Sequence, residues 1–253
     1  MKLAQPLYTD YEKSLLGSIA PGRLPRHIGV LMDGNRRWAA QLGKSTKHGH
    51  QAGAERVADF LRWCKDLDIP MVTLYMLSTE NLKRSAAELA DLLEVIEGLV
   101  LALADSKVAK IYPVGQLWRL PASLAASFSQ AATATSQVKQ VQVNIAVGYD
   151  GRQEIVDAMR QLLLEAQKNG QTMADLMNNL KVEDIDQYLY TCGMPDPDLL
   201  IRTSGEQRLS GFLTWQSAYS EFYFSQVLWP DFSRVEFLRA LQDYAKRQRR
   251  FGS

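Results

Sequence analysis

The chain has 253 residues, and 46% of them are hydrophobic, which is enough to bury the core of one large domain or two small ones. Its 29 Lys and Arg nearly balance its 28 Asp and Glu, so the formal net charge is +1. Overall charge therefore gives no reason to expect binding to nucleic acid or to an anionic membrane, and any anion site must be local.

The amino-terminal residues 1–25 are expected to form a lead-in segment with little helix or only a short one, followed by a single domain over residues 26–253. The lead-in lacks the apolar stretch of a signal peptide. No window approaches the ~18 apolar residues of a membrane span. Two widely separated cysteines, Cys64 and Cys192, predict buried free thiols rather than a metal site. We therefore expect a soluble, cytoplasmic protein.

Short apolar runs alternate with longer amphipathic ones along the rest of the chain. The expected strands are bounded by turn residues and cover residues 27–32, 71–77, 110–115, 141–148, 198–205 and 222–229. The expected helices have apolar residues at three- and four-residue spacing and cover residues 52–67, 86–105, 151–167 and 233–248. This alternation predicts one α/β domain with a central, mostly parallel six-stranded sheet flanked by helices.

Arginine dominates the polar residues that follow the expected strands, where ligands bind in sheets of this kind. Asp33 and Gly34 precede two arginines after the first strand, and Arg202, Arg208 and Ser210 end or follow the fifth. Guanidinium groups match phosphate oxygens in paired hydrogen bonds, and glycine lets backbone N–H groups approach an anion. An aspartate beside them suits Mg²⁺ held between a carboxylate and phosphate oxygens.

The stretch over residues 33–37 has a second interpretation, a tight turn in which Asp33 caps the next helix and the arginines are solvated. Two separate arginine-rich rims favour the first interpretation. They indicate two anionic groups bound at once, as in a transferase with two phosphorylated substrates. Neither rim contains GxxxxGK[ST] or GxGxxG, so nucleotide hydrolysis and dinucleotide binding lack their signatures.

Three other features stay open on the residues alone. The helix over residues 86–104 is apolar nearly all round, which indicates either core packing or the wall of an apolar cavity that suits a lipid tail. His48 and His50 would face apart on a helix, which argues against a metal pair and leaves a phosphate contact or a cap. The simplest interpretation of Glu221 is a strand-edge residue.

Four motifs resemble the cis-prenyltransferases, the undecaprenyl diphosphate synthase family. They are HIGVLMDGNRRWA at 27–39, LSTEN followed by Arg84, NIAVGYDGR at 144–152, and the long run over 198–232. The likeness covers residues 25–251. It implies a homodimer with an apolar tunnel, and Mg²⁺-dependent condensation of an allylic diphosphate with isopentenyl diphosphate to form a Z double bond.

The resemblance also implies roles by matched position. Asp33 and Glu221 would hold the metal, with Glu221 supplied by the same chain or by the partner subunit. Arg202, Arg208 and Ser210 would hold isopentenyl diphosphate. The allylic diphosphate site would be lined by Gly34, Asn35, Arg36 and Arg37, with His50 and Arg84 nearby. Further implied substrate-binding residues are Trp38, Ser78, Thr79, Glu80 and Asn81. Asp33, Asn35 and Ser78 are the implied catalytic residues, and the proton acceptor is left open between Asn35, Ser78, water and diphosphate.

Several positions depart from the family pattern. Thr46, beside Lys47, stands where an arginine is common, and Arg36 replaces a glycine and could restore the lost charge. Other replacements are Leu82 for tryptophan, Ser204 for glycine and Gln207 for histidine. Met76 stands where long-chain members have alanine on the tunnel wall. It predicts the short-chain, (2Z,6E)-farnesyl diphosphate synthase branch, with geranyl diphosphate extended by one unit.

The sequence also has three alternative functional interpretations. A long-chain synthase for a cell-wall carrier lipid differs only in product length. A non-catalytic partner subunit is disfavoured because Asp33, Arg202, Arg208 and Glu221 are all present. A Rossmann-type oxidoreductase lacks its glycine fingerprint. Whether the enzyme makes peripheral contact with a membrane stays open.

Overall fold

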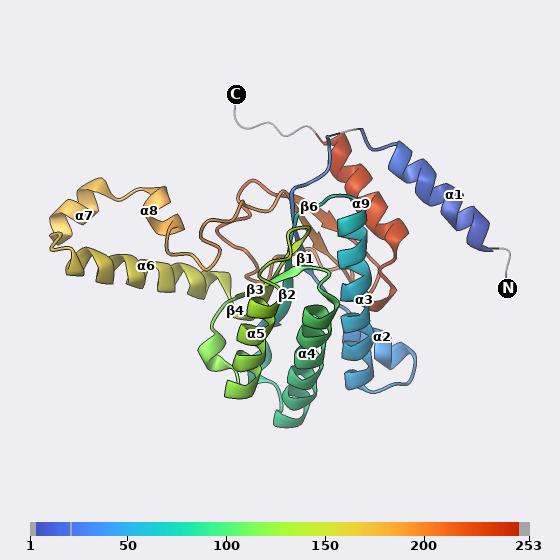
Figure 1. Ribbon diagram of the computed structural model, residues 1–253, viewed down its shortest axis with the longest axis horizontal. Helices are drawn as coiled ribbons and strands as arrows, with labels where there is room; N and C mark the ends of the chain where they lie inside the picture. The colour runs from blue at the N-terminus through green and yellow to red at the C-terminus, as the bar shows by residue number, and fades with distance from the viewer. Residues whose placement is uncertain (1–3, 21, 248–253) are drawn as a thin grey trace.

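Six parallel strands form the centre of the structure, in the order β3-β4-β2-β1-β5-β6 (Figure 1). The computed structural model describes residues 4–20 and 22–247. The strands are β1 (His27–Leu31), β2 (Met71–Ser78), β3 (Lys110–Val114), β4 (Gln142–Tyr149), β5 (Leu199–Arg202) and β6 (Glu221–Phe224). The predicted six-stranded sheet of an α/β domain is therefore confirmed. The prediction was a mostly parallel sheet, and in the structure every strand pairing is parallel.

The four predicted helices are present, and further ones accompany them. The α-helices are α1 (Ala4–Gly17), α2 (Asn35–Gln41), α3 (Thr46–Asp66), α4 (Ala86–Ser106), α5 (Ala122–Ala134), α6 (Gly151–Lys168), α7 (Met173–Asn179), α8 (Val182–Asp186) and α9 (Arg234–Lys246). Short 3₁₀ turns are η1 (Asn81–Lys83), η2 (Leu117–Arg119) and η3 (Trp229–Asp231). Polar N-caps explain where several helices begin: Ser45, Ser85, Asp150 and Ser233 each accept a backbone N–H two or three residues ahead.

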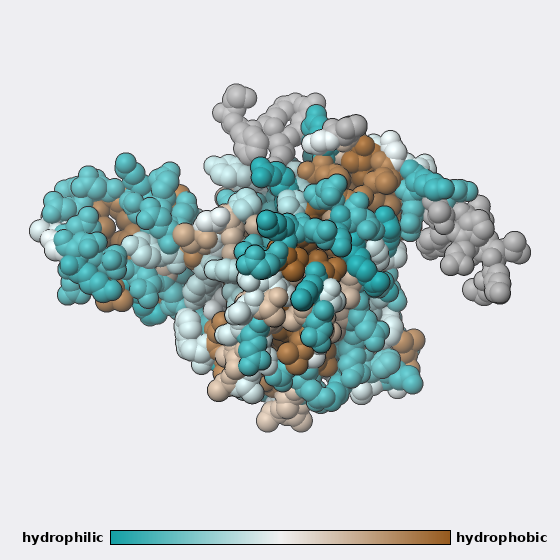
Figure 2. Space-filling view, viewed as in Figure 1, coloured by the Kyte–Doolittle hydropathy of each residue, from teal (hydrophilic) through white to brown (hydrophobic). Residues whose placement is uncertain are grey.

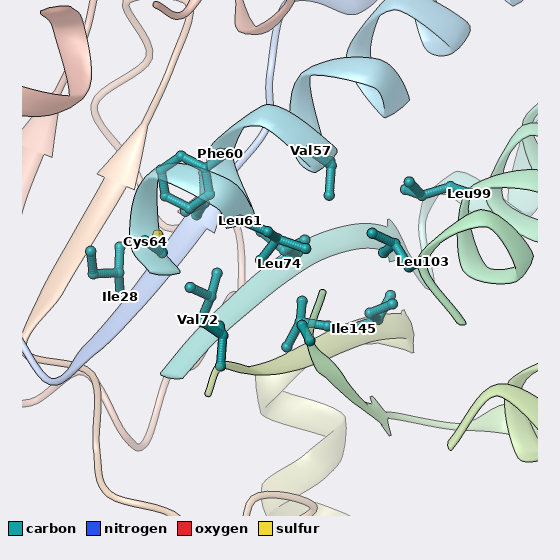
Figure 3. Close-up of a cluster of buried hydrophobic side chains, with 14 of the residues drawn as sticks. Ile28, Val57, Phe60, Leu61, Cys64, Val72, Leu74, Leu99, Leu103 and Ile145 are labelled. Carbon is teal, nitrogen blue, oxygen red and sulfur yellow. The ribbon is translucent and has the colours of Figure 1, made fainter. Parts of the chain in front are cut away.

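The main hydrophobic core lies between the sheet and the helices α3, α4, α5 and α9. Figure 3 shows side chains of α3, including Phe60 and Leu61, facing Ile28, Val72 and Leu74 on β1 and β2. All five are fully buried. Because each such side chain contributes about 1.5–3 kcal/mol on burial, α3 is fixed firmly over the two strands that lead to the cavity described below.

Two predictions about the surface need correction or completion. Cys64 is buried as predicted, but Cys192 is exposed, because it lies in the turn that follows α8 rather than beneath a helix. The lead-in contains the fourteen-residue helix α1, which lies beside α9. Gln242 donates to the Ser18 hydroxyl at 2.6 Å across that contact. A domain boundary at residue 25 remains a prediction, and the predicted helical residue 248 lies outside the described residues.

The helices α6, α7 and α8 form an arm that extends from the body (Figure 1). Figure 2 shows hydrophilic residues over most of this face of the molecule, with hydrophobic residues reaching it in the centre of the body. Within residues 4–20 and 22–247, no helix combines the length and the apolar character needed to cross a bilayer.

Candidate functional site

A cavity of about 480 Å³ opens where β1, β2 and β5 end. Its mouth is polar, and its far part is lined by apolar residues of α3, β2 and α4: Ala54, Val57, Met76, Leu92, Val95, Ile96 and Leu99. One face of α4 therefore forms part of the cavity wall, which confirms that interpretation of the segment 86–104 for this face. A polar mouth joined to an apolar chamber suits an amphiphile with one anionic end.

Asp33 and Arg202 meet at the cavity mouth because β1 and β5 are neighbours, with Leu31 opposite Arg202. The Asp33 Oδ2 atom accepts a hydrogen bond from Arg202 Nε at 2.9 Å and lies 2.7 Å from Arg202 Nη2 as an ion pair. The Arg202 side chain is only 6% exposed, whereas that of Asp33 is 42% exposed. Thr203 fixes the turn, since its hydroxyl donates to the Asp33 carbonyl at 2.8 Å. The carboxylate is thus held rigidly yet stays open to the cavity.

Gly34 allows the tight path from β1 into α2. Its φ of 107° lies in the region that favours glycine, and an added Cβ would lie 2.8 Å from Leu228 Cδ2. Gly34 is itself the N-cap of α2, and no side chain caps that helix. The interpretation in which Asp33 caps the helix is therefore wrong, because its carboxylate is engaged by Arg202 instead.

A cluster of charged side chains lies on the predicted allylic side of the mouth. Arg36 on α2 and Arg84 after η1 both line the cavity and both contact Glu88 on α4. Lys47 does not join them, because its Nζ pairs with Glu94 at 2.7 Å and with Asp91 at 3.6 Å. The positive charge at this side of the mouth therefore comes from Arg36 and Arg84.

Two buried polar atoms beside the cavity have no hydrogen-bond partner: Asn35 Oδ1 and His50 Nε2. Burial, together with the charge of Arg84, lowers the pKa of His50 to about 4, so this imidazole is neutral at pH 7. Gly49 and Gly53 of α3 make room for Asn35. An added Cβ at Gly49 would lie 2.2 Å from the Asn35 carbonyl oxygen, and one at Gly53 would lie 2.4 Å from Asn35 Oδ1. Unpaired buried polar groups in a cavity are ready to contact a ligand.

The loop after β2 holds itself in place by a reciprocal pair of bonds. Asn81 N–H donates to Ser78 Oγ at 3.1 Å, and Ser78 N–H donates to Asn81 Oδ1 at 3.0 Å. Ser78, Glu80 and Asn81 line the cavity. Thr79 instead donates its N–H to the Tyr149 carbonyl.

Trp38 lies outside the cavity lining. Its ring stacks on His48, and its Nε1 donates to Asp231 at 2.8 Å. This residue supports α2 and the start of α3, and the structure gives it no position against a ligand in the mouth.

The predicted isopentenyl side is assembled by the segment after β5. Arg202 Nη1 donates to Ser210 Oγ at 2.9 Å and to the carbonyl of Arg208. Arg208 and Arg37 both approach Glu206, the latter at 3.8 Å. All of these residues line the same cavity, so the two arginine-rich rims form a single mouth.

Asp150 and Glu206 line the cavity and belong to the polar residues after strands that were expected at this rim, although no role was assigned to them. Tyr75 and Glu88 were not predicted. Tyr75 has its hydroxyl 3.3 Å from the Ser210 carbonyl, and burial raises the pKa of that phenol, so it remains a donor. Its position near the carboxyl end of β2 was an available signal, but Glu88 belongs to a helix, and no sequence pattern linked it to the mouth.

Met76 lines the apolar part of the cavity from β2. Alternation along the strand places it on the same face as Leu74, which belongs to the core on the side of α3 and α4. The register against β4 skips one residue between Tyr75 and Leu77, so β2 contains a bulge there. The bulge changes the facing of Leu77, which joins the core on the same side as Met76.

Glu221 lies at the opposite end of the sheet from Asp33. It opens β6, opposite Leu199, which itself lies opposite Ile28. Five residues along the strand direction correspond to about 16 Å. Its carboxylate accepts from Arg247 Nη1 at 2.8 Å. A metal shared by Asp33 and this chain's own Glu221 is therefore excluded by distance, and the alternative with a partner subunit remains a prediction.

The mouth fits Mg²⁺ in one particular way. In the described part of the chain, no three His, Cys, Asp or Glu side chains come together as a metal site. Mg²⁺, however, is usually bound by one or two carboxylates together with substrate phosphates and water. Both contacts from Arg202 end on one oxygen of Asp33, and the carboxyl is partly exposed. Asp33 can thus serve as the single protein carboxylate of such a site.

Ser204 carries a strained backbone next to this mouth. Its φ is 73°, and its buried hydroxyl has no partner. The Ser204 carbonyl accepts from Arg37 Nη2 at 3.2 Å. A Cβ is unfavourable in this left-handed conformation, so glycine would suit the position better than serine.

Comparison with known proteins adds to this geometry. A protein-family model described as "Putative undecaprenyl diphosphate synthase" matches residues 31–252. The chain is 52% identical over 248 residues to the (2Z,6E)-farnesyl diphosphate synthase of Thermobifida fusca, covering 98% of this chain and 97% of the relative. It is 49% identical over 255 residues to the short-chain Z-isoprenyl diphosphate synthase of Mycobacterium bovis, covering 99% and 97%. The crystal structure of lavandulyl diphosphate synthase from Lavandula x intermedia, in complex with dimethylallyl diphosphate, matches with a TM-score of 0.86 and 32% identity, covering 91% and 99%.

Proposed function

Because the chain belongs to the undecaprenyl diphosphate synthase family of cis-prenyltransferases, we propose that it extends geranyl diphosphate by one isopentenyl diphosphate unit. The product is a short Z-prenyl diphosphate such as (2Z,6E)-farnesyl diphosphate, the product in the name of the relative from Thermobifida fusca. The enzyme acts as a cytoplasmic homodimer with Mg²⁺.

The observation that supports this product most directly is Met76 on the wall of the apolar part of the cavity. The cavity of about 480 Å³ also includes the polar mouth, so only part of it is open to a prenyl tail. A bulky side chain on the wall narrows that part, which favours a short tail over a long-chain product.

The reaction breaks the allylic C–O bond and forms a C–C bond from the isopentenyl alkene to the allylic carbon. Negative charge develops on the departing pyrophosphate, and the guanidiniums of Arg36 and Arg84 are arranged at the mouth to stabilise it. Asp33 would hold Mg²⁺, and the ion would neutralise part of that charge. Arg202, Arg208 and Ser210 hold the diphosphate of the isopentenyl substrate beside it.

The apolar chamber protects the allylic cation that develops as the C–O bond breaks. Leu92, Ile96 and Leu99 line it and offer no nucleophile, so the isopentenyl alkene rather than water reaches the cation. Loss of a proton from the adjacent carbon of the isopentenyl unit then gives the Z double bond.

Asn35 is the better placed of the two side chains predicted to assist proton loss. Its Oδ1 is buried and unpaired, whereas Ser78 Oγ already accepts from Asn81. An amide oxygen is a weak base, so Asn35 orients the C–H bond and the released pyrophosphate takes the proton.

In this proposal Glu221 reaches the Asp33 metal only from a second copy of the chain. Each copy would then contribute the Glu221 at the amino end of its β6 to the mouth of its partner. Release of Glu221 from Arg247 would accompany this exchange.

Product analysis tests the proposal. Purified protein is incubated with Mg²⁺, radiolabelled isopentenyl diphosphate, and either geranyl or farnesyl diphosphate, and the products are separated by chain length and double-bond geometry. We expect one 15-carbon Z product from geranyl diphosphate. A ladder of 50–55 carbons would establish the long-chain alternative. A protein inactive alone that stimulates a second subunit would instead be the non-catalytic partner.

A further inference from the structure

One glutamate joins two arginines at the cavity mouth. Glu88 Oε1, in the first turn of α4, accepts from Arg84 Nη1 at 3.1 Å and from Arg36 Nη1 at 3.4 Å. The side chains of Arg84 and Glu88 are 20% and 27% exposed, whereas Arg36 is 59% exposed. A single carboxylate oxygen therefore connects α2, the end of η1 and α4 at the point where the mouth opens.

The pair of arginines would be unstable without this carboxylate. Two guanidiniums within reach of one oxygen repel each other, and burial and Arg36 both lower the pKa of Arg84. Arg84 is held by its partly buried position, but Arg36 is exposed enough to rotate into water. Loss of the carboxylate charge would therefore release Arg36 first.

Arg36 also has a particular importance in this chain. Thr46 supplies no charge, and Lys47 is engaged by Glu94 and Asp91 on α4. Of these three residues, Arg36 in the first turn of α2 is therefore the one whose positive charge lines the cavity. Glu88 contacts only one terminal nitrogen of each guanidinium in the two bonds above, and a guanidinium has five donors, so both arginines keep donors for phosphate oxygens.

We propose that Glu88 is a positioning residue, which holds Arg36 against Arg84 so that both guanidiniums meet the diphosphate of the allylic substrate. The identity of that substrate rests on the proposed function, but the capture of a diphosphate group does not. Glu88 acts through Arg36, so its effect should depend on Arg36 being present.

A double-mutant cycle tests this dependence. Binding of inorganic pyrophosphate is measured by calorimetry in metal-free buffer for the parent, Glu88→Gln, Arg36→Gly and the double variant. With Arg36 present, Glu88→Gln should weaken binding about threefold or more, as expected for loss of a partly buried ion pair. With Arg36→Gly, the same change should matter less than about 1.5-fold. In steady-state assays, the KM for geranyl diphosphate should rise in proportion, while kcat and the KM for isopentenyl diphosphate stay within about twofold.

A matched control is Glu97→Gln on the same helix, since Glu97 accepts from the Ser127 hydroxyl outside the cavity lining. It should leave pyrophosphate affinity unchanged. Equal effects of Glu88→Gln in both backgrounds, or tighter pyrophosphate binding by that variant, would overturn the proposal. The titration needs no turnover. A protein that made no prenyl product would therefore refute the proposed function while the cycle still tested the role of Glu88.

Discussion

Replacing Met76 with alanine should lengthen the product. The change removes three heavy atoms, or roughly 90 Å³ at about 30 Å³ per atom, whereas one isoprene unit of five carbons needs roughly 150 Å³. The removed atoms therefore free more than half of the space that one more unit needs, and adjustment of the neighbouring leucines must supply the rest. We expect a 20-carbon product to appear beside the 15-carbon one.

The assay is chromatography of products formed from radiolabelled isopentenyl diphosphate and geranyl diphosphate. Met71→Ala is the matched control, because Met71 begins the same strand at its opposite end, away from the cavity. It should leave product length unchanged. If Met76→Ala gave the parent's product distribution, Met76 would not limit the chamber, and the reasoning from cavity volume would be refuted.

Three further predictions concern stability and the turn after β1. His50 has a lowered pKa of about 4, so the unfolded chain binds more protons than the folded one between about pH 6.5 and 4. The free energy of unfolding should therefore fall by about 1–2 kcal/mol between pH 7 and pH 5. Urea unfolding of His50→Gln should show a smaller fall over the same range. Ser204→Gly relieves a φ of 73° and removes an unpaired buried hydroxyl, so the free energy of unfolding should rise by about 0.5–1.5 kcal/mol; an unchanged or lower value contradicts this. Gly34→Ala places a Cβ 2.8 Å from Leu228 and should displace Asp33, lowering kcat/KM by roughly tenfold or more, whereas near-parent kinetics would show that the turn tolerates a side chain.

The convergence of Asp33 and Arg202 was predictable, although they are far apart in the chain. Both lie at the carboxyl ends of strands, and in a parallel sheet such ends share one edge. The structure makes these strands neighbours, so the two side chains form a hydrogen bond of 2.9 Å and an ion-pair contact of 2.7 Å. Strand order itself was not predictable, because periodicity specifies an element and not its neighbours.

Glu221 illustrates a signal that was present but unused. It begins a strand, and in a parallel sheet the first residue of a strand lies at the amino edge, opposite to Asp33. Sequence reasoning could therefore have excluded a metal shared within one chain. Its role through a partner is a separate proposal.

Leu77 and Glu88 were beyond the reach of sequence patterns for different physical reasons. Leu77 joins the same core as Leu74 and Met76 because of a β-bulge, and one inserted residue reverses the alternation on which facing is predicted. Glu88 reaches Arg36 across a separation of 52 residues, and that contact depends on α3, which packs against both α2 and α4. Packing between helices determines such pairs, and it cannot be predicted from local composition.

The central claim is that Asp33 anchors the departing pyrophosphate, with its metal, at the entrance to an apolar chamber. Single-turnover formation of prenyl product from geranyl and isopentenyl diphosphates, compared between the parent and Asp33→Ala, tests it most directly. We predict that the rate of C–C bond formation falls by at least about a hundredfold in the variant while the protein remains folded. Product formation by Asp33→Ala at the parent's rate would contradict the account.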